Sequence, residues 1–272
     1  MRLDPGRLSS DDVRRRFDNA APTFDDADYV HRATCDGLIE RLAPVAVTPG
    51  VVVDLGAATG RGGDTLHKQY PGAKIVSVDV SRQMLQIASR SRGLFSRYRP
   101  VAIQADARSL PLQSGCADLV FANLLLPWID EPVDCFAEVA RVLRKGGVFA
   151  FSTLGPDSLA DLKEQLPVHD FPDMHDVGDA LVRTGLSDPV LDVDRLRVTF
   201  RKAAGLVDDL FASGACSGDR DDLEAGIADA GEGQDWALNL ELVFGHAWGV
   251  GPRTAGGEFH VDAGAIGRRS LP

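Results

Sequence analysis

The chain has 272 residues, of which 44% are hydrophobic and 25% are charged. These proportions are typical of a globular protein with a substantial core. The formal net charge of −11 argues against binding to nucleic acid or to a membrane over the whole surface, because both of those partners are anionic. We therefore expect neither partner, while a local basic patch could still serve an acidic protein.

The four cysteines, at positions 35, 116, 135 and 216, include no C-x-x-C pair. Scattered cysteines favour free thiols over a disulfide framework or a zinc site. No apolar run reaches the ~18 residues that a membrane span needs, and the N-terminus lacks an apolar signal region. We expect a cytoplasmic protein without a bound metal ion.

The first half of the chain predicts helices followed by alternating strands and helices. Residues 10–43 have helical character, with amphipathic segments at 11–17 and 29–42. Beyond Pro49-Gly50 we expect strands at 51–55, 73–79, 101–105, 118–122 and 148–153, and helices at 62–70, 82–91 and 133–144. Such alternation indicates parallel strands joined by right-handed crossovers, with helices on both faces of the sheet.

The second half has a looser pattern. We expect a helix that opens at 155–159, a helix at 173–183, an extended segment at 189–200 and a last strand at 238–248. Residues 213–235 carry seven acids, one arginine and several glycines. That composition predicts a mobile acidic surface loop.

The most informative motif joins two strands that each end in an acid. The apolar run 51–53 leads into Asp54 and then into the turn Gly56–Gly60, and a second run, 75–78, ends at Asp79. This is half of a nucleotide-binding α/β sheet. An acid at the tip of the second strand is placed to accept hydrogen bonds from ribose hydroxyls, so we expect a cofactor that contains adenosine.

NAD and S-adenosylmethionine both fit that motif, and three details favour S-adenosylmethionine. The turn lacks the G-x-G-x-x-G pattern of NAD sites. Asp54 precedes the first glycine, where it can meet the amino group of a methionine moiety. Asp106 follows the third strand, where it can accept a hydrogen bond from the adenine amino group, and Asn123 follows the fourth. All four positions lie at the carboxyl ends of strands, where open α/β sheets bind ligands.

These segments resemble the motifs of class I S-adenosylmethionine-dependent methyltransferases. The likeness rests on Asp54–Gly60, Asp79, Asp106–Pro111, Asp118–Asn123 and Leu143–Gly147. It implies a Rossmann-like fold with a mostly parallel seven-stranded sheet, and it implies S-adenosylhomocysteine as the product. The cofactor-binding residues that we expect are Asp54, Gly56, Ala57, Gly60, Asp79, Val80, Met84, Asp106, Ala107 and Asn123.

The turn departs from that family at its centre, where Ala58 replaces the usual glycine. A Cβ atom there costs little if φ is negative. It strains the turn or crowds the cofactor if φ is positive. Met84 in the following helix is expected to pack against adenine or to belong to the ordinary core.

The flanking segments resemble the malonyl-acyl-carrier-protein O-methyltransferases of biotin synthesis. The matching segments are 13–25, 123–128, 152–159, 171–181, 188–193 and 245–248. The resemblance implies transfer of a methyl group to the free carboxylate of a malonyl group on an acyl carrier protein. That carboxylate is ionised near neutral pH, so no catalytic base is expected, and positioning and desolvation would carry the reaction. The family usually has tyrosine where this chain has Phe24.

The same segments recur in arginine-hydroxylating assembly factors of respiratory complex I. A methyltransferase or hydroxylase-like relative with another acceptor, and a non-catalytic assembly factor, therefore stay open as alternatives. Arg32 could bind the substrate carboxylate, and Trp128 could line the substrate pocket or pack under the N-terminal arm. An acidic carrier protein requires a basic docking surface, for which the candidates are Arg14, Arg15, Arg16, Arg90, Arg92, Arg97, Arg99, Arg144 and Lys145.

We expect two parts within one globular unit. Residues 1–49 would form a helical arm that acts as a lid, and residues 50–272 would form the methyltransferase domain.

Overall fold

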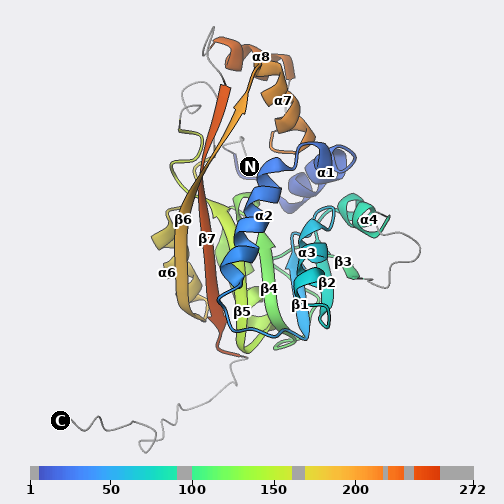
Figure 1. Ribbon diagram of the computed structural model, residues 1–272, viewed down its shortest axis with the longest axis vertical. Coiled ribbons are helices and arrows are strands. Elements are labelled where there is room, and N and C mark those ends of the chain that lie inside the picture. Colours follow the sequence, from blue (N-terminus) through green and yellow to red (C-terminus); the bar gives the residue numbers. More distant parts are fainter. Residues whose placement is uncertain (1–5, 91–99, 161–168, 217–219, 230–235, 252–272) are drawn as a thin grey trace, which may run out of the picture.

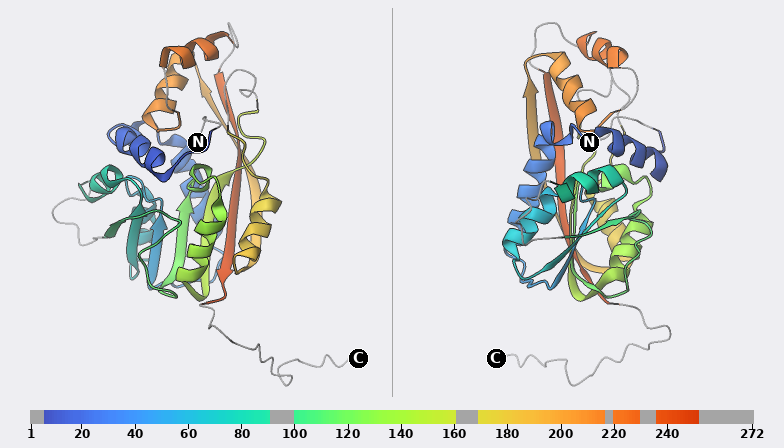
Figure 2. Two further views of the ribbon diagram at one scale, coloured as in Figure 1. Left: turned by 180° about the vertical axis from the view of Figure 1, so that it is seen from behind. Right: turned by 90° about the vertical axis from the view of Figure 1, so that its right-hand side faces the viewer.

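The structure of the protein is a computed structural model that describes residues 6–90, 100–160, 169–216, 220–229 and 236–251. A central sheet lies between two layers of helices, and further helices cross one end of it (Figures 1 and 2). The strands are β1 (Val51–Leu55), β2 (Lys74–Asp79), β3 (Val101–Gln104), β4 (Ala117–Asn123), β5 (Leu143–Leu154), β6 (Leu186–Phe200) and β7 (Trp236–Gly249).

The helices fall close to the predicted ranges in the first half of the chain. Their bounds are α1 (Ser10–Ala20), η1 (Phe24–Asp26), α2 (Tyr29–Leu42), α3 (Arg61–Gln69), α4 (Arg82–Arg90), η2 (Leu126–Trp128), α5 (Pro132–Val142), α6 (Met174–Arg183), α7 (Ala203–Ala212) and α8 (Arg220–Asp229). None of the helices within the described ranges is both long enough and apolar enough to cross a lipid bilayer.

The seven strands have the order β3-β2-β1-β4-β5-β7-β6. Every pair from β3 to β5 is parallel, and β7 is antiparallel to both β5 and β6. The predicted mostly parallel sheet is therefore confirmed. The chain crosses from β3 on one edge to β4 beside β1, so the strand order reverses between β1 and β4, which is where open α/β sheets form their ligand crevice.

Two hydrophobic clusters fill the space on the two faces of the sheet. Val52 of β1 packs in the cluster that contains residues of α2, α3 and α7. Its neighbour Val53 packs in the opposite cluster with α5 and α6. Consecutive strand residues point to opposite faces, so both faces of β1 are apolar and fully buried. Such a strand reads as a continuous apolar run in the sequence.

The N-terminal arm has two different roles. Helix α2 belongs to the core, because Cys35, Leu38 and Leu42 are buried against the sheet. Helix α1 lies across the carboxyl ends of the strands, as Figure 1 shows, and Phe24 of η1 lines the α2 side of this end. The part of the predicted lid that covers this end of the sheet is therefore shorter than residues 1–49.

The hairpin of β6 and β7 extends beyond the rest of the sheet. Pairing of β7 with β5 ends where Leu154 faces Leu242, but pairing with β6 continues until Phe200 faces Trp236. The connection at its tip carries α7 and α8, which lie above α1 at the same end of the molecule (Figure 1). We refer to α7 and α8 as the cap.

Two expectations were wrong. The helix predicted to reach residue 144 ends at Val142, because the chain turns into β5 and Leu143 already pairs with Ala117. Residues 156–159 form turns and residue 160 has 3-10 conformation, and the residues into which the helix predicted to open at 155–159 would continue, 161–168, lie outside the described residues. Residues 220–229, within the predicted acidic loop, form α8, while residues 217–219 and 230–235 of that loop lie outside the described residues.

Candidate functional site

The turn after β1 is built from residues in left-handed backbone conformation at alternating positions. Gly56, Ala58 and Gly60 have φ values of 76°, 45° and 94°. The backbone N–H groups of Gly56 and Ala57 donate to the carbonyl oxygen of Val78 at 2.8 and 3.0 Å. These bonds fold the turn back onto β2, so bare backbone faces the carboxyl end of the sheet.

Ala58 is in the conformation that disfavours a side chain. A positive φ brings Cβ close to the following carbonyl and costs about 1–2 kcal/mol for a residue other than glycine. Its methyl group packs against the cluster of Ala21, Phe24 and Met84 under the arm. Its N–H donates to Asp79 Oδ2 at 2.8 Å. Packing against the arm and the bond to Asp79 offset the strain that the missing glycine introduces.

Asp79 is buried at the tip of β2, with 9% of its surface exposed. Its Oδ1 accepts a hydrogen bond from the N–H of Ser81 at 2.8 Å, and its Oδ2 accepts one from Ala58. Burial nevertheless raises the pKa of Asp79 to about 6, and the nearby Asp18 carboxylate adds to the rise. Ribose hydroxyls would supply donors that the ionised carboxylate lacks here.

Asp54 lies at the end of β1 with 2% of its surface exposed. Its carboxylate rests against the first turn of α3, where a Cβ atom added to Gly62 would lie 2.9 Å from Asp54 Oδ1. Only a residue without a side chain leaves the carboxylate in this place. The N-terminus of a helix carries partial positive charge that favours an anion here.

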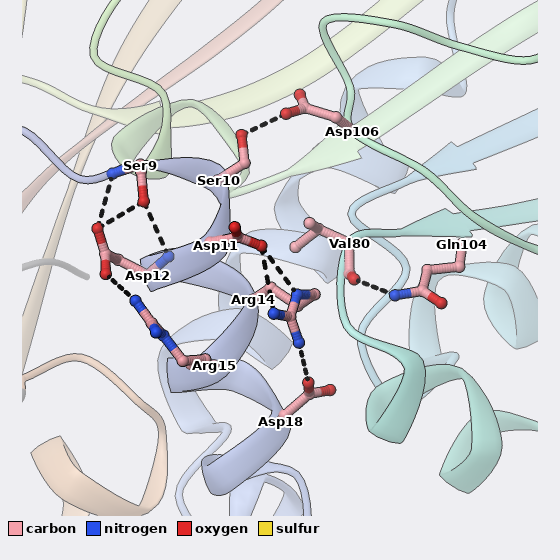
Figure 3. Close-up of polar contacts among 10 residues, drawn as sticks. All are labelled: Ser9, Ser10, Asp11, Asp12, Arg14, Arg15, Asp18, Val80, Gln104 and Asp106. Carbon is pink, nitrogen blue, oxygen red and sulfur yellow. Dashed lines mark hydrogen bonds and ion pairs between the residues drawn. The ribbon is translucent and has the colours of Figure 1, made fainter.

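Asp106 follows β3 and is held by the arm and by its own loop. Arg108 pairs with it through Nε and a terminal nitrogen, at 3.1 and 2.8 Å. Ser10 of α1 donates its hydroxyl hydrogen to Asp106 Oδ2 (Figure 3). These contacts, the Arg108 bonds foremost, lower the pKa of Asp106 to about 2. The carboxylate predicted to bind adenine therefore already contacts the lid.

Two cavities open at this end of the sheet and share Gly56. One has a volume of about 510 Å³ including its mouth, and lies between the arm and the ends of β2 and β3. The other has about 390 Å³ and lies beneath η1 and α2. We call them the β2–β3 cavity and the α2 cavity. Together they form an elongated site on both sides of the turn after β1.

Most of the predicted cofactor residues line these cavities. Six of the predicted residues, counting Trp128, line the β2–β3 cavity: Gly56, Asp79, Val80, Asp106, Ala107 and Trp128. Four line the α2 cavity: Asp54, Gly56, Ala57 and Asn123. The structure thus brings the three predicted carboxylates to one rim of the sheet.

Gly60, Met84 and Arg32 are the predicted residues that do not line either cavity. Gly60 shapes the turn and is the N-cap of α3. Met84 is fully buried beneath the arm with Phe24, as expected of a core residue, and its contact with adenine stays a prediction. Arg32 pairs through Nε with Asp28 at 3.1 Å.

Asn123 holds the arm to the sheet. Its Nδ2 donates to the carbonyl oxygen of His31 at 2.9 Å, and its Oδ1 accepts from the Ser152 hydroxyl at 2.8 Å. The His31 ring lines the α2 cavity beside Phe24, and burial lowers its pKa to about 3. A neutral imidazole therefore faces the α2 cavity.

Trp128 combines the two roles that the sequence left open. It lines the β2–β3 cavity, and its ring packs edge-on against Phe17 of α1 with 4.7 Å between ring centroids. The residue is 6% exposed, and its Nε1 has no hydrogen-bond partner among the described residues. A buried indole N–H without an acceptor is costly, so this donor suits an acceptor atom on a ligand.

The arm is fastened to the rim by polar contacts that sequence analysis missed. Oxygen atoms of Asp25 and Asp18 in the arm accept from the hydroxyl groups of Thr59 and Ser81 at 2.6 and 2.7 Å. Other missed residues are Ser10, Asp28, Arg61 and Arg108, and Arg61 pairs with the buried Asp28 at 2.9 Å. Arg61 and Asp28 are 33 residues apart in the chain, and Arg108 and Ser10 are 98 residues apart, so no local pattern relates them.

The basic residues proposed for carrier docking do not share one surface. Arg14 and Arg15 lie on α1 and pair with acids of the same helix (Figure 3). Arg144 pairs with Asp118, whose carboxylate also accepts from the backbone of Gly50 and Val51 at the amino ends of the strands. That end is opposite the cavities. Residues 92, 97 and 99 lie outside the described residues.

The site fits S-adenosylmethionine, which combines adenosine with a positively charged sulfonium and an amino acid. The turn and the start of α3 offer backbone without side chains at Gly56 and Gly62, where an added Cβ atom would lie 3.2 Å from Leu125 and 2.9 Å from Asp54 Oδ1. Buried carboxylates at Asp54 and Asp79 complement positive charge and hydroxyl donors. The hydroxyl groups of Ser10, Thr59 and Ser81 each donate to a carboxylate that joins the arm to the rim, so these contacts hold the arm in place, and the arrangement serves binding and positioning.

Comparison with known proteins agrees with this geometry. A family model described as a methyltransferase domain matches residues 53–151. Proteins named malonyl-[acyl-carrier protein] O-methyltransferase from Laribacter hongkongensis and Halorhodospira halophila are each 36% identical to this chain. The alignments cover 87% and 98% of this chain and 88% and 99% of those proteins.

Solved structures share the fold at low sequence identity. A methyltransferase structure from Bacillus halodurans, titled as putative, is 16% identical with a TM-score of 0.63, and the match covers 79% of this chain and 98% of that one. The [4+2]-cyclase SpnF is 19% identical with a TM-score of 0.62, over 91% and 100% of the two chains. Because a cyclase shares the fold, the fold alone does not define the reaction.

The match to the curated relatives extends over most of the chain, and the family model covers residues 53–151, which include the predicted cofactor motifs. The chain belongs to the S-adenosylmethionine-dependent malonyl-[acyl-carrier protein] O-methyltransferase family.

Proposed function

We propose that this protein transfers a methyl group from S-adenosylmethionine to the free carboxylate of a malonyl thioester on an acyl carrier protein, in biotin precursor synthesis. The observation that carries the proposal is the 36% identity over 98% of the chain to a relative that is named for this reaction. A site made for binding and positioning supports it, because the acceptor carboxylate is already ionised near neutral pH and requires no base.

The two cavities divide the cofactor between them in this proposal. The methionine part would occupy the α2 cavity, with its amino group near Asp54 and Ala57. The ribose would meet Asp79, and the adenine would lie in the β2–β3 cavity near Asp106 and Ala107. The turn at Gly56 lies between the two parts, so the sulfonium would lie next to bare backbone.

S-adenosylmethionine, when bound, supplies an electrophilic methyl group on a positively charged sulfur. The chain contributes by holding the acceptor in line with that group and by excluding water with α1 and η1. Trp128 Nε1 is the donor that we assign to an oxygen atom of the substrate, because it is buried, lines the β2–β3 cavity and has no protein acceptor in the described part of the chain. Arg32 could bind the same carboxylate only after exchanging its ion pair with Asp28.

The proposal also includes the organisation and location of the protein. Residues 1–49 would act as the arm and residues 50–272 as the methyltransferase domain, with α2 contributing to the core of the second part. All four cysteines are free thiols, which supports a reducing compartment such as the cytoplasm.

The test is a turnover assay with purified protein and malonyl carrier protein. We expect formation of S-adenosylhomocysteine and of the malonyl methyl ester, detected by mass spectrometry of the carrier. Acetyl carrier protein, which has no free carboxylate, is the matched control and should not react. Methylation of free malonate at the same rate would contradict the carrier-bound substrate. Binding of S-adenosylhomocysteine without any turnover would instead favour the assembly-factor alternative.

Complementation tests the biological role separately. A cell that lacks its own biotin-pathway methyltransferase should grow without biotin when it expresses this protein. Growth restored only by added biotin would contradict the assignment to this pathway.

A further inference from the structure

A third and larger cavity separates the arm from the cap. It has a volume of about 1450 Å³ including its open mouth, and it lies between α1 and the helices α7 and α8. We call it the arm–cap cleft. Its walls are Leu8, Asp12, Arg15, Arg16, Asn19, Ala20, Thr23, Asp208, Phe211, Ala212, Gly214, Cys216 and Arg220. None of these residues was predicted to bind the cofactor.

The arm–cap cleft adjoins the cofactor site. Leu8 lines both this cleft and the β2–β3 cavity. Arg16, in the wall of the cleft, lies with its guanidinium 5.5 Å from the ring centroid of Trp128, which lines the β2–β3 cavity. A thin wall of side chains therefore separates the open cleft from the place where the substrate carboxylate would be held.

Direct contacts between the arm and the cap fix the inner end of the cleft. The Thr23 hydroxyl donates to the carbonyl oxygen of Ala212 at the end of α7, at 3.2 Å. Gly214 has a φ of 71°, and a Cβ atom added there would lie 3.2 Å from the Cβ atom of Ala20. These contacts join the arm to the cap at the inner end of the cleft.

The walls of the cleft combine apolar and cationic side chains, and the Arg220 guanidinium lies 6.0 Å from the centroid of the Phe211 ring. Leu8, Ala20 and Phe211 supply apolar surface. Two guanidinium groups lie at more exposed positions, and each pairs with an acid: Arg15 with Asp12 at 2.6 Å, and Arg220 with Asp208. The Arg15 side chain is 66% exposed. Exposed ion pairs of this kind contribute little stability, so an incoming anion could replace the aspartates at small cost.

We propose that the arm–cap cleft receives the phosphopantetheine arm of the carrier protein, with Arg15 and Arg220 binding its phosphodiester. This inference rests on the proposed function. The substrate class is a thioester on an extended amide chain that ends in a phosphate, and guanidinium groups bind phosphate with charge-assisted hydrogen bonds. The apolar interior contacts the methylene groups, and the malonyl end reaches Trp128 past Leu8 and Arg16.

Two malonyl substrates separate the phosphate contact from the chemistry. One is malonyl carrier protein, and the other is the malonyl thioester of N-acetylcysteamine, which has no phosphate. In the double variant Arg15→Gln, Arg220→Gln, we expect KM for the carrier substrate to rise about tenfold or more, with KM for the truncated thioester unchanged. The matched control is Lys68→Gln, Arg183→Gln, which removes the same charge from exposed positions on α3 and α6.

A plug variant tests the cleft independently of charge. Asn19 is exposed on α1 and faces the cleft, so Asn19→Trp should fill its mouth without disturbing the core. We expect weaker turnover of malonyl carrier protein with unchanged affinity for S-adenosylhomocysteine, which also reports correct folding. Carrier turnover within about twofold of the parent protein in both variants would overturn the proposal, as would equal loss with both substrates in the arginine variant.

The outcomes distinguish the two proposals. If the parent protein binds S-adenosylhomocysteine but methylates neither malonyl thioester, the proposed function fails, and the assignment of the cleft fails with it. If the parent protein methylates both thioesters and the cleft variants behave like it, only the assignment of the cleft fails.

Discussion

Replacing Asp79 by asparagine should change the stability of the fold and the affinity for the cofactor in ways that can be measured separately. Burial raises the pKa of this carboxyl from 3.8 to about 6. A shift of about 2 units corresponds to about 3 kcal/mol. Because the folded pKa is raised, the folded state binds the proton more tightly than the unfolded chain does. The stability that the protonated form provides is complete below about pH 4 and is lost as the pH rises through 6.

The difference in unfolding free energy between Asp79→Asn and the parent protein should therefore depend on pH. Asparagine cannot ionise, so the variant should gain about 2 kcal/mol relative to the parent between pH 4 and pH 8, mostly below pH 6.5. Asparagine accepts only at its carbonyl oxygen, so one of the N–H groups of Ala58 and Ser81 loses its acceptor, which costs about 1–3 kcal/mol at every pH. The pH dependence, rather than the absolute difference, reports the buried charge.

Urea unfolding at a series of pH values, without cofactor, measures this difference. Asp106→Asn is the control, because contacts with Arg108 lower the pKa of Asp106 to about 2. Its difference from the parent should be nearly constant between pH 5 and pH 8. A constant difference for Asp79→Asn would refute the argument. Calorimetry with S-adenosylhomocysteine should show affinity lower by about 1–3 kcal/mol in Asp79→Asn, from loss of a charged acceptor for the ribose hydroxyls.

Three further substitutions test other parts of the site. Gly62→Ala places a methyl group 2.9 Å from Asp54 Oδ1. Calorimetry should show weaker binding of S-adenosylhomocysteine. The melting temperature should stay unchanged, because alanine is about 1 kcal/mol more favourable than glycine within a helix. Ala58→Gly should change the unfolding free energy by less than about 1 kcal/mol, because relief of the positive φ is offset by a lost methyl contact and added chain entropy. Ser10→Ala should raise the affinity for S-adenosylhomocysteine, measured by calorimetry, because it removes a donor that occupies the Asp106 oxygen assigned to adenine.

Two of these substitutions have a matched control. Ser9→Ala removes the capping contact of the same helix but no bond to Asp106, so it should lower stability without the gain in affinity expected for Ser10→Ala. Ala58→Val introduces a branched side chain at φ 45° and should cost about 1–3 kcal/mol. Unchanged affinity in Gly62→Ala would show that Asp54 does not need its present position, and weaker binding in Ser10→Ala would show that closure of the arm assists the cofactor.

The sequence predicted the sheet well because each strand has a local signal. The segment from Val51 to Leu55 is apolar except for Asp54, and the structure gives the strand those same bounds. Acids at the tips of strands were predicted to share one rim from the topology of parallel sheets, and Asp54, Asp79 and Asp106 do so. Predictions that depend only on residues close together in the chain, such as apolar runs and acids at strand ends, were therefore correct here.

Contacts between distant segments could not be predicted in this way. The bond between Ser10 and Asp106 joins residues 96 positions apart, and no spacing rule relates them. The sign of φ at Ala58 also could not be predicted, because it depends on how the turn after β1 folds back onto the distant strand β2. By contrast, the position of Arg144, a candidate for carrier docking, could have been predicted. A residue at the start of a parallel strand lies at the amino end of the sheet, opposite the ligand crevice.

The arm links the cofactor site to the substrate site. Its acids Asp18, Asp25 and Asp28 contact the segments that follow β1 and β2. Helix α1, which carries Asp18, also forms one wall of the arm–cap cleft, where it contributes Arg15. Any movement of α1 that admits the cofactor must therefore also change the cleft. Since Phe24 of the arm and Met84 of α4 pack with the Ala58 methyl group, the residue that departs from the glycine pattern lies where the arm joins the two sites.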